Sequence, residues 1–564
     1  MLQIPACWLV FVVLIGGLGL PLTASLPLAA DERINLGAVA GCLAVYLAAW
    51  IVYWCGFSIG AFWVLPAVAC VLCLLRWPRL RALWRDPAGR RMCALWLILA
   101  AWCLGLLALI RSYSGGEWVG DWLEHYDRTR FFLDHQSLNT LFLNIYPLPA
   151  RPPLANLVTG AFMALTGNDF AQSQIFSTLL ATLAFFPTVL LARRFARGRD
   201  PAAAVLVLLM LNPLFTQNAT FAWTKLPAAF FTLSGLLFFL GAGRGPADLR
   251  LRCAVVCLAA ALLTHYATAP YFIVLGAAWL ARSRSEWSRV GFWWQAACLS
   301  VIGLIVLGTW LGWSVFHYGL GPTLLTNTAV SASKGLSLAA QLSLRVTNFI
   351  NTLVPHPLRP AEYAYIQQAS AWSWWRDYFF NIYQTNLPMA FGSGGLVALA
   401  VLGWRRRHQV SAFWWWFLPA VVLLSIAAVS WPDRWGAAHI GLQPIVILGL
   451  AWLAANLPAL GWGLRVWLAV GLMLDFCLGI AGHFWLQHLA FPADLFIKQR
   501  GQELLLVHGY AAWNNFLTKS DRHLTFVGDS GLPAPLVCGL LAVLLGWALW
   551  SALRPISKVS MRTP

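Results

Sequence analysis

The sequence predicts an all-α protein that crosses a membrane many times, with about 13–15 transmembrane helices and amphipathic loop helices on its outer face. The chain has 564 residues, of which 60% are hydrophobic and only 10% are charged. A soluble domain carries roughly 25% charged residues, and one this apolar would expose large hydrophobic patches to water. A bilayer requires this composition, and the 33 tryptophans are typical of membrane interfaces.

Basic residues outnumber acidic residues, 38 to 20, and give the chain a net charge of +18. In a soluble protein this excess would indicate nucleic acid as a partner. Here the basic residues lie in short loops between apolar runs, where they indicate the cytoplasmic side of the membrane. We therefore expect the lipid bilayer, and no nucleic acid, as a partner. The loops assigned to the cytoplasm are 76–91, 193–199, 244–252, 282–289, 405–408 and the tail from Arg554.

Cysteine usage predicts no disulfide framework. The 12 cysteines lie almost entirely inside apolar runs. Cys70 and Cys73 form a CxxC pair, but within a continuous apolar segment, where a zinc or redox role is not expected.

The apolar runs and the long loops between them divide the chain into four regions. The long loops are less basic than the short ones, so we expect them to face outward. The regions are extra N-terminal transmembrane helices (1–91), a main transmembrane module (92–317) with the first outer loop (111–169), an outer aromatic loop (318–386), and C-terminal helices (387–564) with a further outer loop (485–532).

The apolar run 249–281 is better explained by two short helices than by one span. Both of its ends carry several arginines, so a single helix would place one basic end on each side of the membrane. Proline disrupts a helix, and we expect the break between Thr264 and Pro270. This break places His265 at or just inside the outer face.

The first outer loop holds the densest polar chemistry in the chain. Four carboxylates fall within residues 117–127, after a predicted spanning helix. On a helix, Asp121 and Glu124 share one face with Asp127 or Arg128. One interpretation is a solvated amphipathic helix with a Glu124–Arg128 pair. The other is a general base, with or without a metal ion, because clustered carboxylates at a membrane surface are costly to desolvate.

Basic and titratable side chains in other loops are candidates for binding a phosphate. Each also has a structural interpretation: an arginine or lysine that reaches the interface from an apolar stem, a histidine that packs with a hydrogen bond, or a polar pair at a helix end. The phosphate candidates are Arg151, Lys225, His265 and Arg434, and the candidates for contacting the substrate are His125, Tyr126, Tyr266 and His439.

The outer loop 318–386 is rich in aromatic residues, among them Trp374, Trp375 and Tyr378. The pattern predicts an amphipathic helix that lies on the bilayer. Aromatic faces also stack on sugar rings, and both roles can coexist.

Two segments resemble motifs of the GT-C superfamily of membrane glycosyltransferases. They are the acidic segment Asp121-Trp-Leu-Glu124-His-Tyr126 and the later motif Arg151-Pro152-Pro153-Leu154. In the protein-mannosyltransferase-like and aminoarabinose-transferase-like branches, of the glycosyltransferase family 39 type, an acidic outer loop ends in a basic-Pro-Pro-Leu motif. The resemblance covers residues 92–290. Ala150 stands where members often carry an acid, and Arg151 where lysine is common.

The resemblance implies a GT-C-like helical bundle and a glycosyltransferase of the plasma (inner) membrane. A sugar would pass from a polyprenyl-phosphate donor to a lipid, polysaccharide or protein acceptor on the extracytoplasmic (periplasmic) side, with inversion. Asp121 would be the first candidate for the general base, followed by Glu124 and Asp127, and the cations would balance the leaving phosphate. No cofactor is firmly implied: Mg²⁺ or Mn²⁺ at the carboxylates is left open, while Ala150 favours chemistry without a metal.

Three other classes remain alternatives. A transporter or flippase usually places paired charges at mid-membrane and shows inverted repeats, whereas the ionisable residues here lie at helix ends and in loops. A non-catalytic scaffold for envelope assembly would not need Asp121, Glu124 and Arg151 together. A polysaccharide polymerase or ligase would instead use lipid-diphosphate oligosaccharides.

Overall fold

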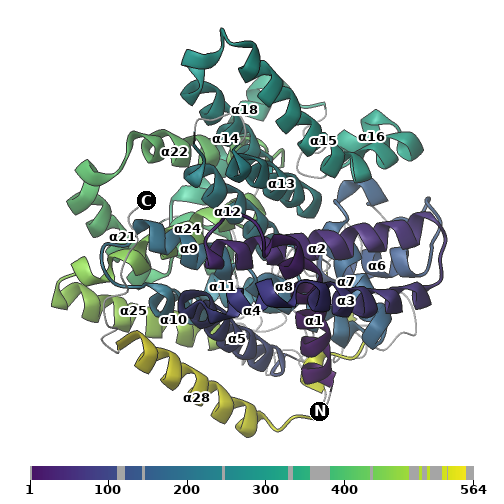
Figure 1. Cartoon of the computed structure of the whole chain (residues 1–564). Coiled ribbons are helices and arrows are strands. Elements are labelled where there is room, and N and C mark those ends of the chain that lie inside the picture. Colours follow the sequence, from purple (N-terminus) through teal and green to yellow (C-terminus); the bar gives the residue numbers. More distant parts are fainter. Residues whose placement is uncertain are drawn as a thin grey trace.

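The computed structural model consists almost entirely of helices (Figure 1). Among the residues it describes, regular strands are limited to β1 (Leu495–Ile497) and β2 (Leu505–Val507), which pair antiparallel. The structure describes residues 3–110, 121–142, 146–243, 248–327, 335–355, 358, 381–431, 436–481, 495–497, 505–507, 524–529 and 531–553.

Seven helices in the described part of the chain are long and apolar enough to cross a membrane, or up to nine if each bent helix pair counts as one span. This confirms an all-helical, multi-pass membrane protein. The total of about 13–15 spans stays a prediction, because shorter apolar helices are not assigned by length and composition alone. The long spans are α1 (Gln3–Thr23), α2 (Ala30–Trp54), α5 (Pro87–Leu107), α8 with α9 (Phe170–Thr182 and Phe185–Phe195), α15 (Val290–Tyr318), α25 (Trp462–Ile480) and α28 (Ala534–Leu553).

The two bent pairs are η1 and α3 (Ile59–Trp63 and Val64–Leu75) with α4 (Trp77–Arg85), and α10 (Ala202–Leu211) with α11 (Pro213–Thr220). The shorter apolar helices are α7 (Leu154–Thr166), α12 (Lys225–Gly241), α22 (Ala412–Ala427), and α24 with η8 (Gln443–Asn456 and Leu457–Ala459). The other elements are α6 (Asp121–Leu133), η3 (Leu148–Ala150), α13 (Leu249–Thr264), η4 (Tyr266–Thr268), α14 (Ala269–Arg282), η5 (Arg284–Glu286), α16 (Leu320–Leu325), α18 (Leu338–Leu353), α20 (Leu387–Ala390), α21 (Ser393–Arg406), η7 (Arg407–Gln409), α23 (Ala438–Gly441) and η10 (Val527–Asp529).

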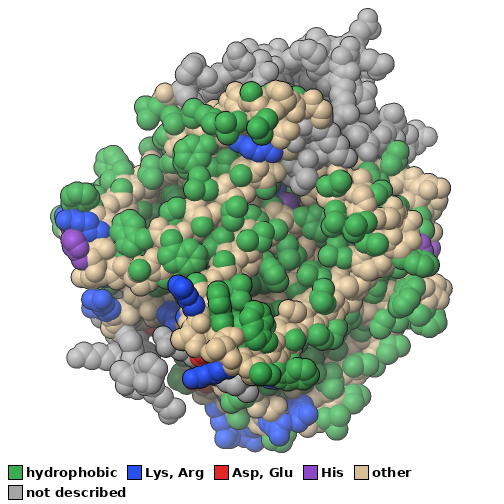
Figure 2. Space-filling model, turned by 90° about the horizontal axis from the view of Figure 1, so that it is seen from above, with side chains coloured by type: hydrophobic (Ala, Val, Ile, Leu, Met, Phe, Trp, Pro, Cys, Tyr) green, Lys and Arg blue, Asp and Glu red, His purple; other side chains and the backbone are tan. Residues whose placement is uncertain are grey.

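Central and peripheral helices differ in how much of their surface is covered. Helices α8, α11 and α12 lie in the middle of the bundle, whereas α28 lies along its edge (Figure 1). Figure 2 shows one face covered largely by hydrophobic side chains, with Lys and Arg near its margins. On helix α15, the apolar side chains of Leu304 and Ile305 are each 66% exposed. Such a surface is stable in contact with lipid, because exposing apolar patches of this extent to water is unfavourable.

Three of the basic loops predicted to face the cytoplasm, those containing Arg91, Arg193 and Arg250, meet on one side of the molecule, which we call the basic side. Ion pairs join segments there that are far apart in the sequence. These pairs are Arg91–Asp200 at 3.7 Å, Arg193–Asp31 at 2.7 Å and Arg250–Glu32 at 2.8 Å.

Helix α2 runs from the basic side to the opposite side. It has 25 residues and is therefore roughly 37 Å long at 1.5 Å per residue. Its first turn holds Asp31 and Glu32, which form the ion pairs just described. Near its other end, Tyr53 stacks on His135, just beyond α6, with ring centroids 5.4 Å apart. The C-terminal end of α6 thus lies about one membrane thickness from the basic loops.

The predicted helix break in 249–281 is confirmed. Helix α13 ends at Thr264, His265 takes an extended conformation, and α14 begins at Ala269 with a proline in its first turn. The outer loop also contains the amphipathic helix α18, which precedes the aromatic residues from which an amphipathic helix was predicted. Its exposed apolar residues, Leu338, Leu342 and Val346, recur every four positions along one face. Trp374, Trp375 and Tyr378 lie outside the described residues.

Residues 524–529, from the last outer loop, pack against α6 and α8. Phe526 contacts Trp122 and Phe170 with ring centroids 5.5 and 5.0 Å away. The backbone N–H of Val527 donates to the Gln174 side chain at 3.0 Å. A segment far along the chain therefore covers one side of α6.

Helices α1 and α2 approach so closely that their backbones touch. A Cβ atom added at Gly41 would overlap the backbone carbonyl of Ile15, and one added at Gly19 would overlap that of Gly37. Small residues at such crossings let helices pack tightly in membranes, where there is no hydrophobic driving force between them.

Gly41→Ala is therefore expected to lower stability by about 1–3 kcal/mol, because the added methyl group forces the two helices apart. The measurement is the apparent melting temperature of the purified protein in detergent. Gly308→Ala is the matched control, because a Cβ at Gly308 in α15 meets nothing within 4 Å. Equal melting temperatures for the two variants would contradict the close packing.

Candidate functional site

Helix α6 carries the three carboxylates proposed as catalytic groups, and its polar residues are mostly buried. Asp121 and Glu124 occupy its first turn, where the positive end of the helix dipole stabilises negative charge. The side chain of Asp121 is 22% exposed, whereas that of Glu124 is 0% exposed. The two carboxylates share one face, as predicted, but they differ in access to solvent.

Glu124 is held between two arginines. Nε of Arg128 donates to Oε1 of Glu124 at 2.8 Å, and Nη2 of Arg151 lies 3.5 Å from Oε2. The Arg128 side chain is only 1% exposed and also donates to the carbonyls of Leu148 and Pro147 at 2.7 and 3.1 Å. The Glu124–Arg128 pair of the first interpretation thus exists, but it is buried instead of solvated.

Arg151 links the two carboxylates of α6. Its Nη2 atom lies 3.6 Å from Oδ1 of Asp121 as well as 3.5 Å from Glu124. A residue before proline is restricted to extended conformations, and Arg151 has φ −133° and ψ 141°. The hydroxyl of Tyr266 approaches the carbonyl of Pro149, two residues before Arg151, at 3.5 Å. Tyr266, one of the predicted substrate contacts, therefore supports the loop that carries Arg151.

The two carboxylates differ in their readiness to accept a proton. Burial raises the pKa of Glu124, but the charges of Arg151 and Arg128 overcome this effect and lower it to about 2. Burial also raises the pKa of Asp121, and the charges of Arg151 and Lys225 offset only part of that rise. A base works best when its pKa lies near the working pH. Asp121 is therefore the stronger candidate for the base.

Trp223, in the turn before α12, and Lys225, the first residue of α12, adjoin Asp121. Nζ of Lys225 lies 3.6 Å from the centroid of the Trp223 ring, which is a cation–π contact. The Lys225 charge lowers the pKa of Asp121, and the Trp223 indole lies near the same carboxylate. Ala222 has a φ of 57°, which is uncommon for a residue with a side chain and marks a constrained turn.

His265, between α13 and η4, and His439, in the short helix α23, lie within the field of the same cations. Burial, followed by the charges of Arg151 and Lys225, holds the pKa of His265 well below its usual range. Burial and Lys225 do the same to the pKa of His439. Both rings are therefore neutral. Nδ1 of His265 accepts from Ala267 N–H at 3.1 Å, so its proton lies on Nε2.

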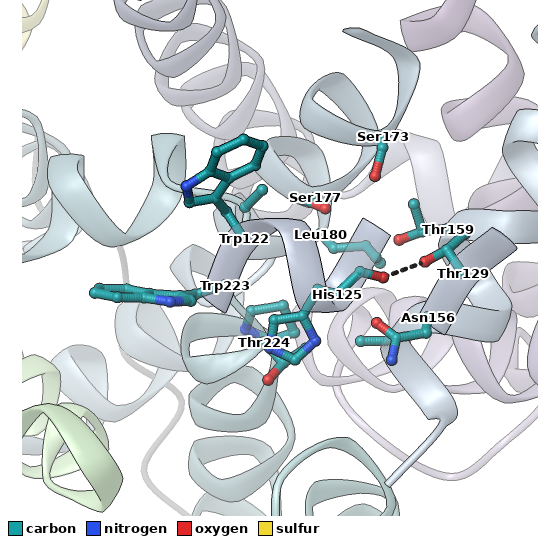
Figure 3. Close-up of a pocket in the computed structure, with 13 residues that line it drawn as sticks. Trp122, His125, Thr129, Asn156, Thr159, Ser173, Ser177, Leu180, Trp223 and Thr224 are labelled. Atoms are coloured by element: carbon teal, nitrogen blue, oxygen red, sulfur yellow. Dashed lines mark hydrogen bonds between the residues drawn. The ribbon is translucent and has the colours of Figure 1, made fainter. Parts of the chain in front are cut away.

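A small polar cavity lies beside these groups, between α6, α7, α8 and the turn before α12 (Figure 3). Its volume is about 10 Å³, which is room for one water molecule and too little for a sugar ring. His125 lines the cavity, and burial lowers its pKa to about 3, so it is neutral. The other polar residues of the lining are Trp122, Thr129, Asn156, Thr159, Ser173, Ser177, Trp223 and Thr224.

Three further predicted residues have different surroundings. Asp127 is partly buried, but the ion pairs of Arg151 are with Asp121 and Glu124. The hydroxyl of Tyr126 donates to the carbonyl of Asn168 at 3.0 Å, on the side of α6 next to α8. Arg434 lies outside the described residues.

The carboxylates of α6 are engaged by arginines. Among the residues that the structure describes, no three or more His, Cys, Asp or Glu side chains gather closely enough to hold a metal ion. A role for Mg²⁺ or Mn²⁺ is tested by measuring transfer with and without EDTA.

Sequence reasoning missed the burial of Arg128 and the role of Trp223. The i,i+4 spacing of Glu124 and Arg128 was visible, but nothing local shows that carbonyls of residues 147–148 receive the guanidinium. Trp223 stands two residues before Lys225, and that spacing was a usable signal. The polar cavity residues Asn156, Thr159 and Ser173 come from two apolar helices and gave no motif.

Fold and site together define a multi-pass membrane protein with a charged, largely buried polar site. No family model matches the chain, and no curated protein matches it. Among solved structures, ArnT from Cupriavidus metallidurans bound to undecaprenyl phosphate is similar over 66% of this chain and 79% of that chain, at 15% identity and a TM-score of 0.31. A similarity at this TM-score does not establish a function for the chain.

Glu124→Gln is expected to destabilise the protein by about 3–5 kcal/mol, because it leaves the buried Arg128 without its counter-charge. The matched control is Asp134→Asn, which removes the exposed partner of Arg130 and should change stability by less than about 1 kcal/mol. Apparent melting temperatures in detergent test both. Similar losses in the two variants would contradict the special position of Glu124.

Proposed function

We propose that the protein is a glycosyltransferase that moves a sugar from a polyprenyl-phosphate donor to an acceptor, in agreement with the motif resemblance. One observation carries the proposal. Asp121, a partly exposed carboxylate with a raised pKa, lies beside the cations Arg151 and Lys225. Transfer from a sugar phosphate needs a base and a phosphate-binding cation close together.

The chemistry is a single displacement. The acceptor hydroxyl attacks the anomeric carbon as Asp121 takes its proton, and the bond between that carbon and the phosphate oxygen breaks. Polyprenyl phosphate leaves with the electron pair of that bond. Arg151 and Lys225 balance its negative charge, and the neutral His265 offers its Nε2–H as a further donor. One displacement at the anomeric carbon inverts its configuration.

Glu124 has a positioning role in this scheme. A carboxylate with a pKa of about 2 is a weak base at neutral pH. Glu124 instead holds the guanidinium groups of Arg128 and Arg151 in place. Arg151 is thereby oriented to bind the phosphate before the reaction begins. Catalysis gains from charges that are already oriented before the reaction begins.

The sidedness of the fold supports a reaction on the extracytoplasmic side of the plasma membrane. Arg91, Arg193 and Arg250 meet on the basic side, and α2 places the end of α6 at its opposite end. Loops rich in Arg and Lys remain in the cytoplasm. The acceptor would then be a lipid, a polysaccharide or a protein reached from outside.

Asp121→Asn is expected to reduce sugar transfer about 10²–10⁴-fold, because the general base is lost. Purified protein in lipid nanodiscs is given polyprenyl-phosphate sugars and an acceptor extract, with and without EDTA, and released polyprenyl phosphate is quantified. Asp134→Asn is the control, since that carboxylate follows α6 but pairs with Arg130. Equal release by wild type and Asp121→Asn would overturn the proposed base, and release of a lipid diphosphate would favour the ligase alternative.

Lys225→Gln is expected to move the acid limb of the pH–activity profile to higher pH. The active form has Asp121 ionised, so activity is present above its pKa and is lost as the pH falls through it. Lys225 lowers the pKa of Asp121, and its removal raises that pKa. The profile of polyprenyl phosphate release against pH measures the shift, with Arg130→Gln as the control. An acid limb that stays in place or moves down would contradict this coupling.

A further inference from the structure

A second cavity lies on the basic side, away from the proposed active site. Its volume is about 90 Å³, enough for several groups the size of a water molecule. It is formed by the first turns of α13 and by the N-terminal part of α15. Asp248 and Arg252 line it from α13, and Trp294, Gln295 and Cys298 line it from α15.

Both signs of charge face this cavity without neutralising each other. Asp248 and Arg252 are four residues apart, a spacing at which such side chains commonly pair on a helix, yet they form no salt bridge. Each Asp248 oxygen accepts one backbone N–H, from Arg250 at 2.7 Å and from Gly243, which leaves capacity for another donor. Among the described residues, the exposed Arg252 guanidinium has no hydrogen-bond or salt-bridge partner.

The neighbouring charges are already engaged. Arg250 donates to Glu32 at 2.8 Å, and the Arg194 side chain donates to the carbonyl of Leu240. Among the charged side chains that the structure places around this cavity, Arg252 is a cation available to a ligand, and Asp248 is the carboxylate beside it.

The wall on the α15 side opens to the lipid-facing surface. Trp294 is 73% exposed, and the adjacent Trp293 is 57% exposed. Tryptophan prefers the membrane interface, at the level of the lipid headgroups. Farther along the same helix, Leu304 and Ile305 present the apolar surface expected against acyl chains.

We propose that this cavity binds the headgroup of a phospholipid that carries a primary ammonium, namely phosphatidylethanolamine. The lipid phosphate pairs with Arg252, and the ammonium, an ethyl linker away, donates to Asp248. A purely anionic headgroup would meet the repulsion of Asp248. The quaternary ammonium of phosphatidylcholine has no N–H to donate. Basic pockets between helices on this side of a membrane are typical lipid-headgroup sites.

The test is native mass spectrometry of the full-length protein in detergent, with phosphatidylethanolamine, phosphatidylglycerol and phosphatidylcholine added in turn. Wild type is expected to bind phosphatidylethanolamine about tenfold more tightly than the other two lipids. This ratio corresponds to the free energy of one charge-assisted hydrogen bond, between the ammonium and Asp248. Asp248→Ser keeps a residue that can cap α13 and should lose the preference over phosphatidylglycerol. Arg252→Gln should weaken binding of all three lipids, whereas Arg284→Gln, on an exposed neighbouring loop, should not.

Several results would overturn the proposal. They are equal binding of the three lipids by wild type, an unchanged preference in Asp248→Ser, and an equal loss in Arg284→Gln and Arg252→Gln. Glycerophosphoethanolamine that competes as well as the whole lipid would show that a soluble headgroup, and not a membrane lipid, is the ligand. The site lies on the basic side, so these outcomes are independent of any result for Asp121.

Discussion

The buried carboxylate of Glu124 is the constraint on which the rest of the site depends. A charge inside a membrane protein is costly unless it is paired and hydrogen-bonded. Arg128 donates a hydrogen bond to Glu124, and Arg151, from a different segment, adds a second positive charge 3.5 Å away. Arg128 in turn ties α6 to the backbone carbonyls of residues 147–148. One ion-pair cluster thereby fixes α6, the loop before α7 and the guanidinium that lies beside Asp121.

The same cluster separates two carboxylates that the sequence presents as equivalent. Both stand in the first turn of α6, three residues apart. Their environments differ because Glu124 faces two guanidinium groups at close range, whereas Asp121 shares one of them and is partly exposed. Opposite shifts in proton affinity are a recognised way for one helix to carry an anchoring acid and a reactive one.

Composition and periodicity were sufficient to predict the class of fold, because apolar runs and basic loops follow directly from the physics of the bilayer. The break at His265 was predictable for the same reason, since Arg-rich ends at 249 and 281 demanded a hairpin. The site was only partly predictable. Asp121, Glu124 and Arg151 were found from local spacing and motif, but the burial of Arg128 depends on carbonyl groups about 20 residues away. The contact of Trp223 with Lys225 is local, and their spacing of two residues was a signal that the sequence analysis did not use.

The packing of residues 524–529 against α6 and α8 has a consequence for how the protein is made. The polar groups of the site come from residues 121–265 and from α23, yet Phe526 fills the space beside Trp122 and Phe170. Residues 524–529 are synthesised only near the end of translation, after most helices have entered the bilayer. Until then the aromatic side of α6 has no cover from this segment. Until that segment has packed, the nascent chain therefore carries an incompletely packed site in the membrane. In this state it is a substrate for chaperones and membrane proteases.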